Sequence, residues 1–108
     1  MTVKELASAL DLKIICMPDG DRAVTGGYAG DLLSWVMGRA KAGDAWVTIM
    51  SNVNIVAVAT LADPACIVLS EGVVADDGVA SKAESLGVNI LSSKEDTFTV
   101  SAKISKLI

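Results

Sequence analysis

Histidine is absent from the 108 residues, which removes the side chain that proteins use most often as a general base and as a metal ligand. Only two cysteines occur, Cys16 and Cys66, and two thiols without histidine cannot complete a tetrahedral zinc site. Neither the serine-hydrolase motif G-x-S-x-G, the P-loop G-x-x-x-x-G-K-[ST] nor the dinucleotide motif G-x-G-x-x-G is present. We therefore expect no enzymatic activity, no cofactor and no metal.

Positive charge is also sparse, with nine Lys and Arg against thirteen Asp and Glu and a formal net charge of −4. Because the positive charges are spread singly along the chain, we expect no binding to nucleic acid. Residues 45–62 carry no charge, but their middle is polar, so they are interpreted as a buried strand and a buried helix. Lys4 and Glu5 interrupt any signal peptide at the N-terminus. We expect a cytoplasmic protein with no membrane contact and with both cysteines as free core thiols.

Apolar spacing along the chain predicts alternating helices and strands. Thr2 and Glu5 fit a capping box at the start of a helix that runs to about residue 10. Further helices are predicted over 31–42, 53–63, 76–86 and 96–107, and strands over 13–17, 45–50, 65–69 and 88–91. Parallel neighbours need long crossovers, which the helices supply. Residues 1–108 therefore form a single α/β domain of three layers, a mostly parallel sheet with helices on both faces.

Residues 21–31 are rich in glycine and are predicted to form a loop that leads into a helix capped by Asp31. Such a helix start favours anions, although the charge of Asp31 opposes them, and the same glycines equally suit a tight turn. Asp21 and Arg22 are adjacent, so they either pair within the loop or leave Arg22 to hold a phosphate or carboxylate. Both readings remain open.

Polar residues follow three predicted strands, in the segments 51–54, 70–72 and 92–93. Ligands of open α/β sheets bind at the carboxyl ends of strands, so these segments predict a cleft, although ordinary helix capping accounts for each of them alone. Tyr28 lies in the glycine-rich segment and Trp35 falls off the apolar stripe of its helix. Exposed aromatic side chains are typical of protein interfaces, and these two predict a homodimer.

The string from Asp21 to Ser34, DRAVTGGYAGDLLS, resembles the signature of the DRTGG-domain family. Residues 46–49 and 54–59 resemble the family's second recurrent block, so the similarity covers nearly all of the chain from about residue 13. The resemblance implies an α/β module similar to the N-terminal domain of HPr kinase/phosphorylase, and one that also occurs beside CBS domains in regulatory inserts of family II pyrophosphatases. It implies a regulatory or assembly role without catalysis.

Two functions are therefore predicted. The first is a non-catalytic, homodimeric regulatory module that senses a small anionic metabolite or a nucleotide. Its candidate ligand-binding residues are Asp21, Arg22, Thr25, Gly26, Gly27, Asn52 and Asn54. The alternative is a structural or docking subunit of a larger metabolic or hydrogenase-related assembly, with a protein partner and no small-molecule ligand. Asn52 stands where the family resemblance leads us to expect a histidine, so any role of that histidine is lost here or reduced to hydrogen bonding.

Overall fold

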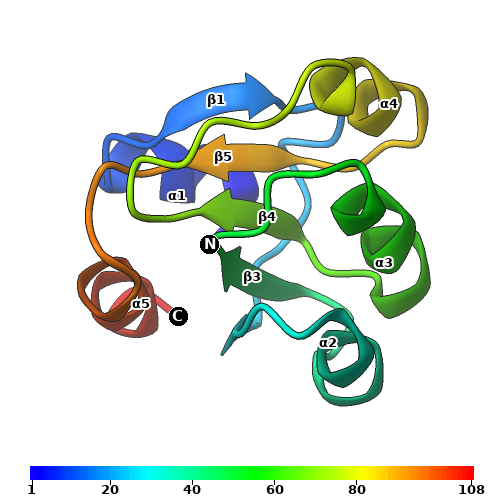
Figure 1. Ribbon diagram of the computed structural model, residues 1–108. Helices are drawn as coiled ribbons and strands as arrows, with labels where there is room; N and C mark the ends of the chain where they lie inside the picture. The colour runs from blue at the N-terminus through cyan, green and yellow to red at the C-terminus, as the bar shows by residue number, and fades with distance from the viewer.

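Five strands form one sheet between two layers of helices in the computed structural model, which describes residues 1–108 (Figure 1). In chain order the elements are α1 (Val3–Ala9), β1 (Lys13–Cys16), β2 (Gly26–Ala29), α2 (Leu33–Arg39), β3 (Asp44–Thr48), α3 (Asn54–Ala62), β4 (Cys66–Leu69), α4 (Val79–Ser85), β5 (Ile90–Ser92) and α5 (Thr97–Ser105). The sheet order is β1-β5-β4-β3-β2. Strands β2 to β5 are parallel, and β1 pairs with β5 in the antiparallel sense. The predicted three-layer α/β fold is confirmed.

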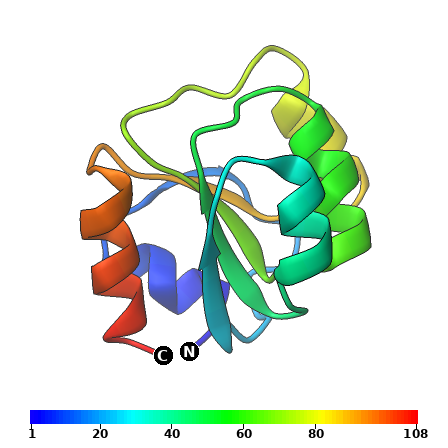
Figure 2. The same ribbon diagram turned by 60° about the horizontal axis from the view of Figure 1, so that its bottom comes forward.

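Helices α1 and α5 cover one face of the sheet, and α2, α3 and α4 cover the other (Figure 2). The central strands β3 and β4 are buried along their whole length, which explains why their sequences do not alternate between apolar and polar residues. The uncharged segment 45–62 becomes β3 and α3, as predicted. No helix of the structure combines the length and the apolar character that crossing a membrane requires.

Side-chain caps start the first and last helices, and the sequence predicts the first of them. The amide of Glu5 donates to Thr2 Oγ1 over 3.1 Å, and the amide of Thr2 donates to Glu5 Oε1 over 2.9 Å. Asp96 Oδ1 accepts from the amide of Thr99 over 2.7 Å. These hydrogen bonds from backbone amides lower the pKa of both carboxyl groups, Glu5 and Asp96, because they favour the ionised form.

Two expectations about the segment before α2 are wrong. Residues 26–29 are the edge strand β2 rather than part of a loop. Asp31 does not cap the helix, because α2 begins after Leu32 without a side-chain cap. The carboxylate of Asp31 instead accepts from the hydroxyl of Thr48 over 2.8 Å and from the amide of Ile49 over 2.9 Å, which ties the end of β2 to the end of β3.

Both cysteines are free thiols. Cys66 is buried in β4, and desolvation raises its pKa to about 12. Cys16 is only half-buried, and its thiol lies 3.2 Å from the carbonyl oxygen of Val88. The expectation of core thiols therefore holds fully for Cys66 and in part for Cys16.

The two chain termini lie at the same end of the molecule. Figure 2 shows them together at the bottom, while the loops that follow β3 and β4 lie at the top. We call these the amino end and the carboxyl end of the sheet, after the direction of strands β2 to β5.

Candidate functional site

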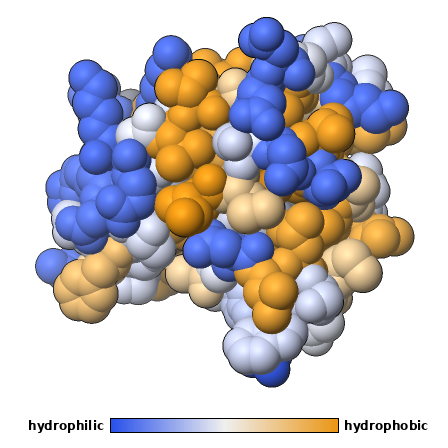
Figure 3. All heavy atoms as spheres, viewed as in Figure 1, coloured by the Kyte–Doolittle hydropathy of each residue, from blue (hydrophilic) through white to orange (hydrophobic).

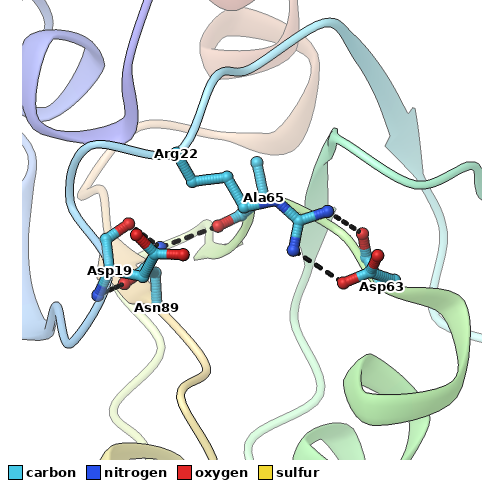
Figure 4. A network of polar contacts seen from close by, with 5 residues as sticks. All are labelled: Asp19, Arg22, Asp63, Ala65 and Asn89. Atoms are coloured by element: carbon cyan, nitrogen blue, oxygen red, sulfur yellow. Dashed lines mark hydrogen bonds and ion pairs between the residues drawn. The ribbon is translucent and has the colours of Figure 1, made fainter.

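Arg22 holds together two segments that are far apart in the sequence. Its Nη1 donates to Asp63 Oδ1 over 2.6 Å and its Nη2 donates to the Asp63 carbonyl oxygen over 2.7 Å (Figure 4). Asp63 ends α3 in the left-handed conformation, with φ of 60°. The hydrogen bond from Arg22 lowers the pKa of Asp63. The guanidinium thus stabilises the end of α3, as charge-assisted pairs of this geometry do.

Asp21 does not pair with Arg22, so the first of the two readings of these residues is wrong. Asp21 Oδ1 lies 3.6 Å from Lys4 Nζ, and both of these side chains are largely exposed. Neighbouring residues of the signature therefore point to different partners, and Arg22 is already engaged within the fold.

Thr25 and Gly26 occupy places where the backbone and side chains of the next strand come close. A Cβ on Gly26 would lie 2.6 Å from Asp44 Oδ1. The Asp44 side chain cannot easily move away, because it is only 7% exposed and its Oδ2 accepts from the amide of Lys41 over 2.8 Å. Thr25 Oγ1 occupies the space that a Cβ on Gly43 would need. The first signature glycine is therefore required for packing.

An open hollow of about 350 Å³ lies beside β2, at the amino end of the sheet. Its lining consists of Thr25, Gly26, Gly27, Tyr28, Arg39, Lys41, Ala42 and Asp44. Neither Arg39 nor Lys41 forms an ion pair, since the three ion pairs of the structure join other residues. The volume is at the lower limit of small-molecule sites, about 300–1,000 Å³. This hollow brings part of the signature together with unpaired positive charge.

Asn52 and Asn54 lie at the opposite end of the sheet from this hollow. Gly26 pairs with Asp44 at the start of β2 and β3, whereas Asn52 follows the end of β3. The Asn52 Oδ1 accepts from the amide of Asn54, the first residue of α3, over 2.9 Å. Asn52 therefore stabilises the start of that helix. The prediction of a single cleft between the glycine-rich segment and the asparagines is therefore wrong.

The segments after β3, β4 and β5 do share one end of the sheet, as predicted. Two of their hydroxyl groups are engaged with nearby side chains: Ser51 Oγ donates to Asp76 Oδ1 over 3.0 Å, and Ser70 Oγ lies 2.7 Å from Thr97 Oγ1. No group of three or more Cys, Asp and Glu side chains is arranged to hold a metal ion.

The chain matches the model of a known protein family. The model of the DRTGG domain matches residues 5–107, almost the entire chain. The chain belongs to the DRTGG domain family. The resemblance drawn from the signature and from the second block is confirmed, whereas the similarity to HPr kinase/phosphorylase stays a prediction.

One solved structure with the fold of this DRTGG domain contains the CBS and DRTGG domains of the regulatory region of Clostridium perfringens pyrophosphatase, complexed with the activator diadenosine tetraphosphate. The TM-score is 0.71 at 11% sequence identity, and the match covers 94% of this chain and 44% of that chain. The chain thus spans less than half of that structure, and likeness at this identity shows the fold alone. No curated protein sequence matches the chain.

The polar network of this DRTGG domain also includes a residue that sequence reasoning missed. Asn89 is buried, and its Oδ1 accepts from the amide of Asp19 over 2.9 Å. Its Nδ2 donates to the carbonyl oxygens of Asp19 over 2.7 Å and Ala65 over 2.9 Å (Figure 4). The turn before the signature is thereby fixed to the sheet. The available signal was an amide between the apolar residues Val88 and Ile90.

The two aromatic residues predicted at an interface differ in exposure. Tyr28 is half-buried and packs against the apolar cluster under α2 and α3. Trp35 is 51% exposed on α2, and the guanidinium carbon of Arg39 lies 3.8 Å from its ring centroid. This cation–π contact holds Arg39 over the indole beside the hollow.

Proposed function

We propose that this DRTGG domain is a non-catalytic regulatory module that binds a small anionic ligand, a nucleotide or a phosphorylated metabolite, in the hollow beside β2. The observation that carries the proposal is the pair Arg39 and Lys41, which line the hollow without a carboxylate partner. The structural neighbour from Clostridium perfringens supports it, since a nucleotide activator is bound to the regulatory region that contains its DRTGG domain.

Five of the lining residues have a definite part in this proposal. Arg39 presents a planar fork that matches a phosphate group, and Lys41 supplies a second positive charge. Gly27 is exposed and carries no side chain, so a phosphate can approach the backbone of β2 closely. Thr25 and Gly26 complete the wall. Arg22 belongs to the structural frame, because Asp63 already occupies its guanidinium.

The absence of catalysis is proposed from the same geometry. The lining of the hollow contains no thiol and no histidine. Its one hydroxyl besides that of the half-buried Tyr28 belongs to Thr25 and packs against Gly43. No side chain there is paired with a general base in the way that nucleophilic catalysis requires.

A thermal-shift panel of adenine and guanine nucleotides, cyclic dinucleotides, phosphosugars and acetyl phosphate tests this proposal. A ligand at a hundred times its Kd stabilises a protein by about 2.7 kcal/mol, which raises the Tm of a domain of this size by roughly 10 °C. The double variant Arg39→Gln/Lys41→Gln should lose the shift. A flat panel overturns the proposal.

The matched control is Lys82→Gln, which removes an exposed, unpaired positive charge from α4, away from the hollow. This variant should keep the full ligand shift. An equal loss in the control would mean that binding depends only on the net charge of the protein. Arg22→Ala is unsuitable as a probe, because it also removes the hydrogen bonds that stabilise the end of α3.

We further propose that the domain acts as a homodimer formed along β2 and α2. β2 is an edge strand with a hydrogen-bonded neighbour on one side only, and such edges readily pair with another chain. Trp35 and Met37 expose about half of their surface on the adjoining helix, 51% and 49% respectively. Light scattering should give the dimer mass for the natural chain and the monomer mass for Trp35→Ser. A monomeric natural chain at micromolar concentration overturns this part.

A further inference from the structure

Large apolar side chains are exposed at the carboxyl end of the sheet, on three of its loops and on the first turn of α5. Leu32 follows β2, Ile49 and Val53 follow β3, Val74 lies between β4 and α4, and Phe98 lies in the first turn of α5. Val74 is 81% exposed and Phe98 is 83% exposed. We call these five residues the carboxyl-end surface. Figure 3 views this end of the molecule and shows apolar side chains running between hydrophilic ones.

The loop that carries Val74 is anchored on both sides. The amide of Glu71 donates to the Glu95 carbonyl oxygen over 2.8 Å, and the amide of Gly72 donates to the Ser93 carbonyl oxygen over 3.0 Å. Further along, the amide of Asp76 donates to the carbonyl oxygen of Ser51 over 3.0 Å. The loop is thus fixed to the segments after β5 and β3 with Val74 turned outward. A surface held in place in this way loses little conformational freedom when a partner binds.

Negative charge predominates on the loops at the carboxyl end of the sheet. The loop residues 30–32, 49–53, 70–78 and 93–96 contain a single positive charge, Lys94. Their carboxylates are Asp31, Glu71, Asp76, Asp77, Glu95 and Asp96. Only Glu95 among them is in an ion pair, with Lys103 at 2.6 Å. Protein interfaces combine apolar contacts with charged groups beside them, and the sign of that charge selects the partner.

We propose that the carboxyl-end surface docks a segment of another protein that is apolar on one face and rich in Lys and Arg around it. A second copy that used the same surface would bring two sets of carboxylates together, which costs free energy. A small anion is disfavoured by the same charge. This docking surface lies at the opposite end of the sheet from the hollow beside β2, so it does not depend on the proposed ligand.

Two synthetic peptides test the proposal on the ¹⁵N-labelled protein. The first is a 16-residue amphipathic helix with Leu on one face and Lys on the other, and the second carries Glu in place of every Lys. The Lys peptide should bind and shift the amide resonances of the five surface residues, with weaker binding as salt is added. The Glu peptide should leave the spectrum unchanged. No binding of the Lys peptide, equal binding of both peptides, or shifts confined to the amino end overturn the proposal.

Variants make the test specific to the apolar side chains. Val74→Ser/Phe98→Ser should weaken binding of the Lys peptide by about tenfold or more, since it removes the two most exposed apolar side chains of the surface. Both residues are so exposed that the fold should be unaffected. The matched control is Leu61→Ser, a 72% exposed residue of α3 near the start of β4, which should bind as the natural chain does. Equal weakening in the control overturns the proposal.

The same variants separate this proposal from the ligand site. Val74→Ser/Phe98→Ser should keep any thermal shift given by a nucleotide or phosphosugar, and Arg39→Gln/Lys41→Gln should keep the binding of the Lys peptide. Head-to-tail association of the natural chain would appear in light scattering as a mass that grows beyond the dimer with concentration, and Val74→Ser/Phe98→Ser would abolish that growth. If the carboxyl-end surface is covered by the amino end of another copy, the docking partner is this chain itself and the proposal of a different protein is wrong.

Discussion

Adding one methyl group at Gly26 or at Gly27 should change the stability of the domain in opposite directions. At Gly26 the new Cβ would lie 2.6 Å from Asp44 Oδ1, closer than any real contact allows. Asp44 is 7% exposed and bonded to the amide of Lys41, so relief requires a shift of packed structure. Overpacking of this kind costs about 1–3 kcal/mol. A loss of about 2 kcal/mol would lower the Tm by roughly 10 °C.

At Gly27 the nearest atom to a new Cβ is the carbonyl oxygen of Ala45 at 3.6 Å, an ordinary contact. The backbone of Gly27 is in an extended strand that alanine adopts freely. The substitution therefore acts through the unfolded chain, whose freedom it reduces, and should stabilise the domain by about 0.4–1 kcal/mol. The Tm should rise by a few degrees.

Urea denaturation of Gly26→Ala, Gly27→Ala and the natural chain measures both effects. In the background of Asp44→Ala, which removes the clashing carboxylate, Gly26→Ala should cost clearly less than it does in the natural chain. Equal destabilisation by the two alanines, or the same cost of Gly26→Ala in both backgrounds, would refute the reasoning.

Three further changes have definite expected outcomes. Arg22→Gln should cost about 1 kcal/mol at pH 7, a value reduced by solvent screening of the exposed Asp63. Arg22 holds the pKa of Asp63 below its ordinary 3.8, so this contribution is complete above that pH and is lost as the pH falls through the lowered value. The difference in the free energy of unfolding between Arg22→Gln and the natural chain, measured by urea denaturation, should therefore be smaller at pH 3 than at pH 7. A difference that is the same at both pH values contradicts the assignment. Iodoacetamide at pH 8 should label Cys16 before Cys66, whose pKa is about 12, and mass spectrometry that finds equal labelling contradicts the burial of Cys66. Trp46→Phe should cost about 1–3 kcal/mol in urea denaturation, because it removes a fully buried indole whose Nε1 donates to a backbone carbonyl over 2.9 Å, and a neutral effect contradicts that role.

Local patterns in the sequence were sufficient for every element of the fold except β2 and α3. The cap of α1 is made by side chains within three residues, so it is visible in the sequence, whereas the equally local cap of α5 was not predicted. The helix α3 is rich in β-branched residues, and it was identified only because a crossover was needed between two parallel strands. β2 contains two glycines, which weaken a strand, so its pairing with β3 was invisible to local preference.

The candidate site was harder to predict because its contacts are long-range. Arg22 meets Asp63, which lies 41 positions further along the chain. The acidic residue beside Arg22 in the sequence was the more obvious partner and proved to be the wrong one. Arg39 and Lys41 were not selected at all, since nothing in the spacing of α2 indicates that its end lies beside the signature glycines. The composition shows that positive residues are few, but it does not show that two of them lie unpaired beside the same hollow.

Because the two termini lie at the same end of the molecule, the domain is suited to insertion into another protein. A chain that enters and leaves at one end can be spliced into a loop of a host protein without spreading that loop apart. The structural neighbour carries this fold as less than half of a longer chain. In any such fusion the host would emerge beside the amino end, and the loops that follow β3 and β4 would lie at the far end, on the side left open to a third molecule.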